Sequence, residues 1–259
     1  MKMPLIPSLR PLATLICTIF IFGGLLTLPN PADAQDTIIL LHGMGRTAAS
    51  MAIMKHRLEH AGFRVISESY PSTEGSVAEH CRWLEKLVER TKKNDGSKIH
   101  FVTHSLGGIV LREYLQRNPL PELGRVVMLA PPNQGSELAN FLKEWPLYQK
   151  LTGPSGQQLG TGDKSLPHTL GTVNFEVGVI AGDVSTNPIA SCIIPGEDDG
   201  KVAVKRTKVK GMRDFLCVHH SHTFIMNSSS VAKETIAFLK TGAFSHGVTG
   251  QPTQDIADF

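Results

Sequence analysis

The chain has 259 residues, of which 41% are hydrophobic and 19% charged, and its formal net charge at pH 7 is +3. This length suits one α/β domain, or at most two small ones, and can bury a large core without disulfide or metal staples. The ordinary apolar content and low net charge argue against disorder. Since 26 Lys and Arg are nearly balanced by 23 Asp and Glu, we expect no nucleic-acid partner.

Residues 1–34 have the three-part pattern of a secretory signal peptide. Lys2 and Arg10 precede an apolar run over 12–28, and the small residues at 32–34 provide an A-x-A cleavage signal. A retained membrane anchor is the alternative, although the apolar run is at the short end for a spanning helix. The pattern therefore predicts a secreted or periplasmic protein.

Short apolar runs alternate with amphipathic segments along the rest of the chain. Strands are expected at 38–41, 63–66, 99–102, 126–130, 177–181, 189–194 and 215–218. Helices are expected at 47–61, 76–90, 106–117 and 230–240. This alternation predicts an α/β fold with a mostly parallel central sheet flanked by helices.

We assign residues 35–240 to one domain, followed by a loose polar tail at 241–259. Residues 131–175 interrupt the alternation with prolines and a segment rich in Gly, Ser and Gln. Long irregular stretches in compact domains are usually functional or disordered, so we predict a lid or cap over the site. Its apolar side chains offer a surface for an acyl chain, or alternatively only pack a short helix.

Three cysteines, Cys81, Cys192 and Cys217, follow the predicted signal peptide. An odd number allows at most one internal disulfide, for which Cys192 and Cys217 are the possible pair in an oxidising compartment. Three buried free thiols are the alternative, because each cysteine lies within an apolar pattern.

Residues 101–108 (FVTHSLGG) lead directly from a predicted strand into a predicted helix. A serine on such a sharp turn is a nucleophile elbow, which needs small residues two positions before and after it. Gly107 meets this need, whereas Thr103 stands where glycine is usual and crowds the turn. Ser105 is therefore the candidate nucleophile.

A serine needs a positioned base, and the base needs a carboxylate. His222 is the favoured base, because it follows the last predicted strand and precedes a helix, with His219 and His220 as alternatives. Asp199 lies just past a predicted strand and is the favoured carboxylate. Asp198 and Asp183 are the second and third choices for that carboxylate.

The amides of Met44 and Leu106 are placed to form an oxyanion hole, because glycines flank Met44 and Leu106 opens a helix. His42, beside them, is expected to be a packed residue that shapes the loop.

No metal or cofactor site is expected. The three histidines at 219–222 lack a second group at ligand spacing, and residues 43–45 lack the third glycine of a dinucleotide fingerprint.

Five segments together resemble the bacterial lipase/esterase group of the α/β-hydrolase superfamily. They are residues 41–45 (LHGMG), 103–108 (THSLGG), 130–136 (APPNQGS), 199–202 (DGKV) and 221–224 (SHTF), in the order of that family. The resemblance implies a Ser105–Asp199–His222 triad, with the Met44 and Leu106 amides as oxyanion hole, and carboxylic-ester hydrolysis without a cofactor.

These residues predict an exported serine esterase or lipase that acts on small-molecule or lipid esters, with transient contact with a lipid surface possible. An acyltransferase or thioesterase would use the same triad. A non-catalytic lipid-binding relative is the alternative from another class, and a fluorophosphonate probe would separate it from an enzyme.

Overall fold

The computed structural model describes residues 35–93 and 95–247. The predicted signal peptide at 1–34 and residues 248–259 of the predicted tail lie outside the described residues. Six parallel strands form one sheet in the order β2-β1-β3-β4-β5-β6. The strands are β1 (Thr37–Leu41), β2 (Arg64–Ser67), β3 (Ile99–His104), β4 (Leu123–Leu129), β5 (Val177–Gly182) and β6 (Asp214–Val218).

Both faces of the sheet are buried, as the continuous apolar runs predict. In β1, Ile39 and Leu41 enter the core on one face, while Ile38 and Leu40 enter the core on the other. The alternation follows from the two-residue period of a strand. The sheet therefore separates two hydrophobic cores.

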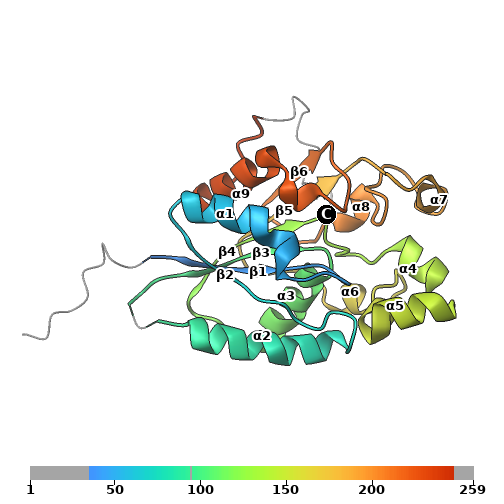
Figure 1. Cartoon of the computed structure of the whole chain (residues 1–259), viewed down its shortest axis with the longest axis horizontal. Helices are drawn as coiled ribbons and strands as arrows, with labels where there is room; N and C mark the ends of the chain where they lie inside the picture. The colour runs from blue at the N-terminus through green and yellow to red at the C-terminus, as the bar shows by residue number, and fades with distance from the viewer. Residues whose placement is uncertain (1–34, 94, 248–259) are drawn as a thin grey trace, which may run out of the picture.

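Helices cover these two faces (Figure 1). The first core packs under α2 (Val77–Thr91) and α3 (Leu106–Arg117), and the second under α1 (Ala52–His60) and α9 (Ser229–Thr241). Short 3-10 segments, η2 (Ala48–Met51) and η3 (Ile225–Asn227), precede α1 and α9. A capping box between Ser76 and Glu79 fixes the start of α2, and the N-cap Ser228 does so for α9.

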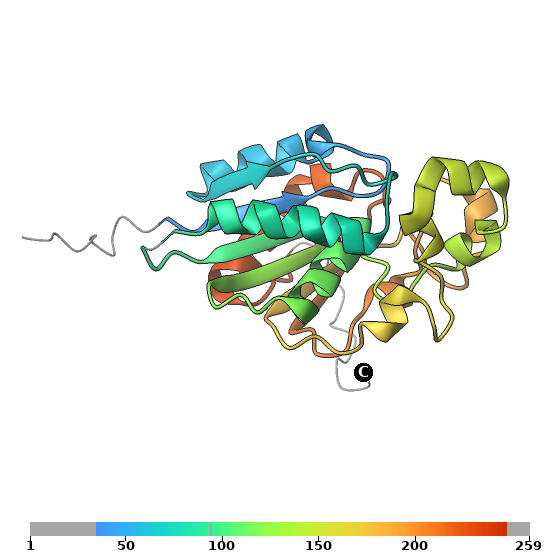
Figure 2. The same ribbon diagram turned by 90° about the horizontal axis from the view of Figure 1, so that it is seen from below.

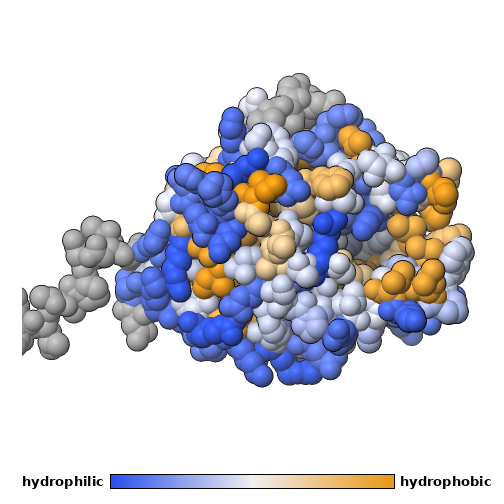
Figure 3. Space-filling model, in the orientation of Figure 1, coloured by the Kyte–Doolittle hydropathy of each residue, from blue (hydrophilic) through white to orange (hydrophobic). Residues whose placement is uncertain are grey.

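Short helices from residues 131–175 lie beyond the carboxyl edge of the sheet (Figures 1 and 2). They are α4 (Glu137–Leu142), α5 (Pro146–Gln157) and α6 (Leu166–Thr169). Figure 3 shows apolar surface over α4 and α5. Four large apolar side chains in and between these two helices are each more than half exposed: Phe141, Trp145, Leu147 and Leu151.

The strand predicted at 189–194 is wrong. The structure places α7 (Pro188–Ser191) there, followed later by α8 (Val204–Thr207). Pro188 favours the first helical position, and the Asn187 side chain accepts a hydrogen bond from the Ala190 amide, so local capping decides for a helix. Ile189 is 76% exposed, which removes the apolar contact expected of a strand.

The cysteines and the tail also differ from expectation. Cys81, Cys192 and Cys217 are free thiols, but Cys192 is exposed because it follows α7 instead of lying in a buried strand. The start of the predicted loose tail is packed: Phe244 is buried, and its amide donates to Asp214 at 2.7 Å. Within the described ranges, no helix is long and apolar enough to cross a bilayer.

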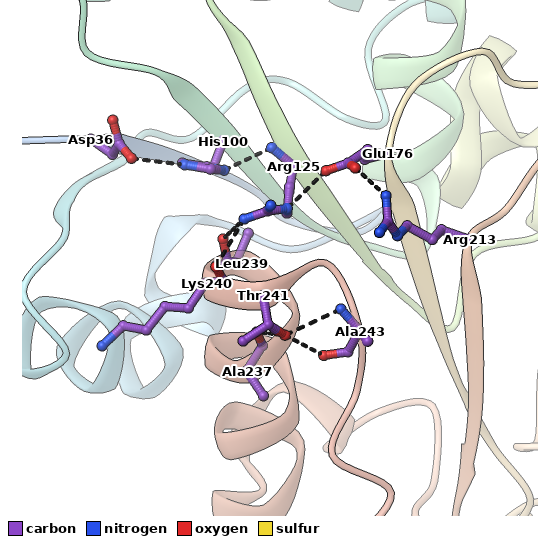
Figure 4. Close-up of polar contacts among 10 residues, drawn as sticks. All are labelled: Asp36, His100, Arg125, Glu176, Arg213, Ala237, Leu239, Lys240, Thr241 and Ala243. Atoms are coloured by element: carbon purple, nitrogen blue, oxygen red, sulfur yellow. Dashed lines mark hydrogen bonds and ion pairs between the residues drawn. The ribbon is translucent and has the colours of Figure 1, made fainter.

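A polar network joins β4 to the end of α9 at the amino edge of the sheet (Figure 4). The Arg125 side chain donates to Glu176 at 2.8 Å and to two carbonyls in the last turn of α9 at 2.9 and 3.0 Å. The Arg125 amide donates to His100, whose other ring nitrogen lies 3.3 Å from Asp36. Arg213 pairs with the same Glu176 from a more exposed position. Arg125 is therefore the residue that holds α9 to the sheet here.

Replacing Arg125 by Met is expected to lower the free energy of unfolding by about 1–3 kcal/mol, since it removes charge-assisted bonds to half-buried groups. Arg213→Met is the matched control and should cost about 1 kcal/mol or less, because its ion pair is solvated. Denaturant unfolding of both variants measures this. Equal losses would contradict the role given to Arg125.

Candidate active site

Ser105 lies on the turn between β3 and α3 in a left-handed backbone conformation, with φ 52° and ψ −121°. A non-glycine residue there costs roughly 1–3 kcal/mol, which the surrounding structure must offset. The Ser105 amide donates to the Leu129 carbonyl at the end of β4, which fixes the turn. Gly107 then brings α3 against β1, because a Cβ at this position would lie 2.7 Å from the Leu41 carbonyl oxygen.

Thr103, which departs from the usual glycine, fits without displacing the turn. Its side chain is fully buried, and its hydroxyl oxygen would lie 3.3 Å from a Cβ on Gly108. The glycine at 108 therefore leaves room for the extra atoms at 103.

Ser105, His222 and Asp199 form a continuous chain of hydrogen bonds. The distance from Ser105 Oγ to His222 Nε2 is 3.0 Å, and that from His222 Nδ1 to Asp199 Oδ2 is 2.7 Å. Asp199 and His222 are 1% and 3% exposed, so this bond is shielded from water. Nδ1 faces an acceptor that has no proton to give, so it carries the hydrogen, and Nε2 of the neutral ring is left to accept from the serine.

The backbone around Asp199 fixes both members of this pair. Asp199 Oδ1 accepts from the amides of Lys201 at 3.0 Å and Val202 at 2.8 Å, which leaves Oδ2 for the histidine. The His222 amide donates to the Asp199 carbonyl at 3.0 Å. The two loops are therefore joined through main chain as well as side chains.

The alternative residues have other partners. His219 lies 3.1 Å from Asp183 and is exposed, while His220 lies 2.8 Å from the Ser228 hydroxyl. Asp198 accepts from the amide two residues later at 2.7 Å. None of these contacts leads to Ser105.

His104, which precedes the serine, positions His222, a role that the sequence pattern does not indicate. It is 1% exposed, and its Nε2 donates to the His222 carbonyl at 3.0 Å. Burial lowers the pKa of His104 well below its ordinary value, and the neighbouring His222 lowers it further. A Cβ on Gly43 would come within 2.8 Å of the other ring nitrogen, so a glycine is required beside this ring. Only the tertiary contact to a carbonyl 118 positions away identifies this role.

His42 shapes the loop after β1, as the sequence predicts. Its Nδ1 donates to the Gly43 carbonyl at 2.9 Å, its Nε2 accepts from the Tyr70 amide at 3.1 Å, and its ring stacks on Tyr70. Burial lowers the pKa of His42, consistent with a neutral ring. Met44 follows on this loop, and Leu106 is the first residue of α3, where amides lack intrahelical partners.

A cavity of about 230 Å³ opens above Ser105. Met44, Ser105 and His222 line it from the loops at the carboxyl edge of the sheet, and α4 and α5 of the segment 131–175 line it as well. The segment's lining residues are Pro132, Ser136, Leu138, Ala139, Tyr148, Leu151, Thr152 and Leu159. Gly45, Arg46, His104, Lys201 and Val202 complete the wall. The segment predicted as a lid or cap thus forms the largely apolar wall of this cavity.

Over residues 35–93 and 95–247, no three His, Cys, Asp or Glu side chains are grouped to hold a metal ion.

Comparison with protein families identifies the family of the chain. A model of the alpha/beta hydrolase family matches residues 38–184, more than half of the chain. The chain belongs to the alpha/beta hydrolase family. Comparison with curated proteins found no match.

Solved structures with a similar fold include lipases, a phospholipase and a carboxyl esterase. A lipase of Bacillus licheniformis in its mature form is 18% identical, with a TM-score of 0.61, over 83% of this chain and 95% of that one. A phospholipase of Legionella pneumophila is 16% identical, with a TM-score of 0.63, over 78% of this chain and 57% of that one. A metagenomic carboxyl esterase is 18% identical, with a TM-score of 0.59, over 74% and 66%. At these identities the likeness is one of fold.

Adding a methyl group at Gly107 is expected to destabilise the protein by about 1–3 kcal/mol, because the group would overlap the β1 backbone. Gly108→Ala is the matched control: it has the same gain in helix propensity, and its methyl group would meet only side chains, at 3.2 Å or more, so it should cost less than the overlap with backbone at 107. Denaturant midpoints of Gly107→Ala and Gly108→Ala should differ accordingly. Equal midpoints would show that the close approach of α3 to β1 is unimportant.

Proposed function

We propose that this protein is an exported serine hydrolase that cleaves carboxylic esters through an acyl-enzyme intermediate. The observation that carries the proposal is the hydrogen-bonded chain from Ser105 through His222 to the buried Asp199. The family and the lipases and esterases that share the fold add support. Export rests on the sequence pattern of residues 1–34.

The geometry suits general-base activation of the serine. Ser105 Oγ attacks the ester carbonyl carbon while His222 Nε2 takes its proton, and Asp199 stabilises the resulting imidazolium. The carbonyl oxygen becomes an oxyanion, for which the Met44 and Leu106 amides are the proposed donors. His222 then protonates the departing alcohol as the carbon–oxygen bond breaks, which leaves the acyl group on Ser105.

Water completes the cycle in the same way. The water oxygen attacks the acyl carbonyl carbon while His222 takes a proton from the water. The tetrahedral intermediate then collapses and releases the carboxylic acid. The proton returns to Ser105 Oγ, so the free enzyme is regenerated.

The cavity supports a small-molecule or lipid ester as substrate. Leu138, Leu151 and Leu159 provide apolar surface for an acyl chain. Its volume of about 230 Å³ is smaller than that of pockets for drug-sized ligands, so short chains fit it best. The exposed apolar side chains on α4 and α5 support transient contact with a lipid surface.

Wild-type protein is expected to hydrolyse nitrophenyl esters of short carboxylic acids and to be labelled by a fluorophosphonate probe. Ser105→Ala should lose both, since no other nucleophile takes its place, while its circular dichroism stays that of the wild type. Turnover measured by nitrophenol release checks this. Retained hydrolysis by Ser105→Ala, or an unlabelled wild-type serine, would overturn the proposal.

Asp199→Asn should lower kcat by roughly 10³–10⁴-fold, because an amide there favours the wrong tautomer of His222. Asp198→Asn is the matched control on the neighbouring residue. Its carbonyl oxygen can still accept from the amide at position 200, so kcat should change by less than about tenfold. A similar loss in both variants would contradict the assignment of Asp199.

A further inference from the structure

Two cationic side chains, Arg46 and Lys201, line the cavity that holds Ser105 and His222. They come from separate segments: Arg46 follows β1, and Lys201 lies between α7 and α8. No Asp or Glu of the described residues lines this cavity. The wall beside the serine is therefore positively charged as well as apolar.

Hydrogen bonds hold the main chain at Lys201 and at the residue before Arg46. The Lys201 amide donates to Asp199 at 3.0 Å, and its carbonyl accepts from the Ser136 hydroxyl at 2.8 Å. The amide of Gly45, next to Arg46, donates to the Ser72 hydroxyl at 3.0 Å. Both side chains thus extend from hydrogen-bonded loops and line the cavity, Arg46 half-buried and Lys201 exposed at its mouth.

The Arg46 charge acts on Lys201, and both charges act on His104. Partial desolvation lowers the pKa of Lys201, and the Arg46 charge lowers it further. Both cations also lower the pKa of the buried His104. Asp199 acts in the opposite sense on Lys201, but its oxygens already accept from His222 and two amides. An anion in the cavity would relieve the repulsion between the two cations.

We propose that the preferred substrates are acyl esters whose alcohol portion carries an anionic oxygen group, a phosphate above all. Arg46 offers the planar fork of donors that matches phosphate or carboxylate oxygens, and Lys201 adds a point charge. The apolar residues from α4 and α5 take the acyl chain, so the two parts of the substrate meet different surfaces. This inference rests on the ester hydrolysis proposed above and names its substrate class.

The test compares three soluble esters with the same hexanoyl chain: hexanoylglycerol, hexanoylglycerol phosphate and hexanoylglycerate. All are used below the concentration at which they aggregate, so a charged lipid surface plays no part. The ratio of kcat/KM for the phosphate ester to that for the neutral ester should be about ten or more. The carboxylate ester should lie between them, since one charge meets two cations.

Removing the cations should remove the preference. Arg46→Gln and Lys201→Gln should each lower this ratio severalfold, and the double variant by about tenfold or more. Lys150→Gln is the matched control: it removes an equal charge from an exposed position on α5 outside the cavity and should leave the ratio unchanged. Added salt should lower the wild-type ratio, because it screens both cations. Since the readout is a ratio, a general loss of activity does not imitate the effect.

A binding measurement separates this inference from the hydrolase proposal. Calorimetry on Ser105→Ala should detect the non-hydrolysable ether hexyl-glycerol phosphate binding at least tenfold tighter than hexyl-glycerol, and Ser105→Ala with Lys201→Gln should lose that difference. Inorganic phosphate should compete only weakly, because it lacks the acyl part. Equal kcat/KM on neutral and anionic esters, or a ratio that survives the double variant, would overturn the substrate class and leave ester hydrolysis standing. Tight binding of the ether phosphate without turnover of any ester would overturn hydrolysis and leave the anion site.

Discussion

Ser105 can keep its left-handed backbone only because rigid elements hold both sides of the turn. β3 is a central strand of the sheet, and α3 is seated against β1 through Gly107, where a side chain would meet the Leu41 carbonyl. These contacts offset the local strain and point the hydroxyl away from the sheet edge. The other parts of the site are arranged around this fixed hydroxyl.

The parallel sheet brings the remaining groups to the same edge. All six strands run in the same direction, so the loops after β1, β3, β5 and β6 leave the sheet at the same edge, although they are far apart in sequence. The backbone bond from His222 to Asp199 and the bond from His104 to the His222 carbonyl lock two of these loops together. The histidine ring is thereby fixed at its main chain and at its Nδ1, which leaves Nε2 for the serine.

The segment 131–175 gives this general site its particular character. Its short helices provide an apolar wall and leave several large apolar side chains exposed. Arg46 and Lys201, on the loops after β1 and after α7, add positive charge to the same cavity. Hydrocarbon and charge in one small cavity favour an amphiphilic ester, and this combination is what separates the proposed substrate class from that of a neutral esterase.

Strand and helix periodicity and turn chemistry are local, so the α/β architecture, the turn at Ser105 and a short set of candidate partners for it can be predicted from the sequence. It misplaced a strand at 189–194, where a proline and an asparagine cap outweigh the apolar pattern. Tertiary structure alone decided which acid and which histidine meet the serine, since His222 reaches Ser105 across 117 positions. The roles of His104, Arg46 and Lys201 also arise only when distant loops converge, because no local pattern records a contact between segments that meet only after folding.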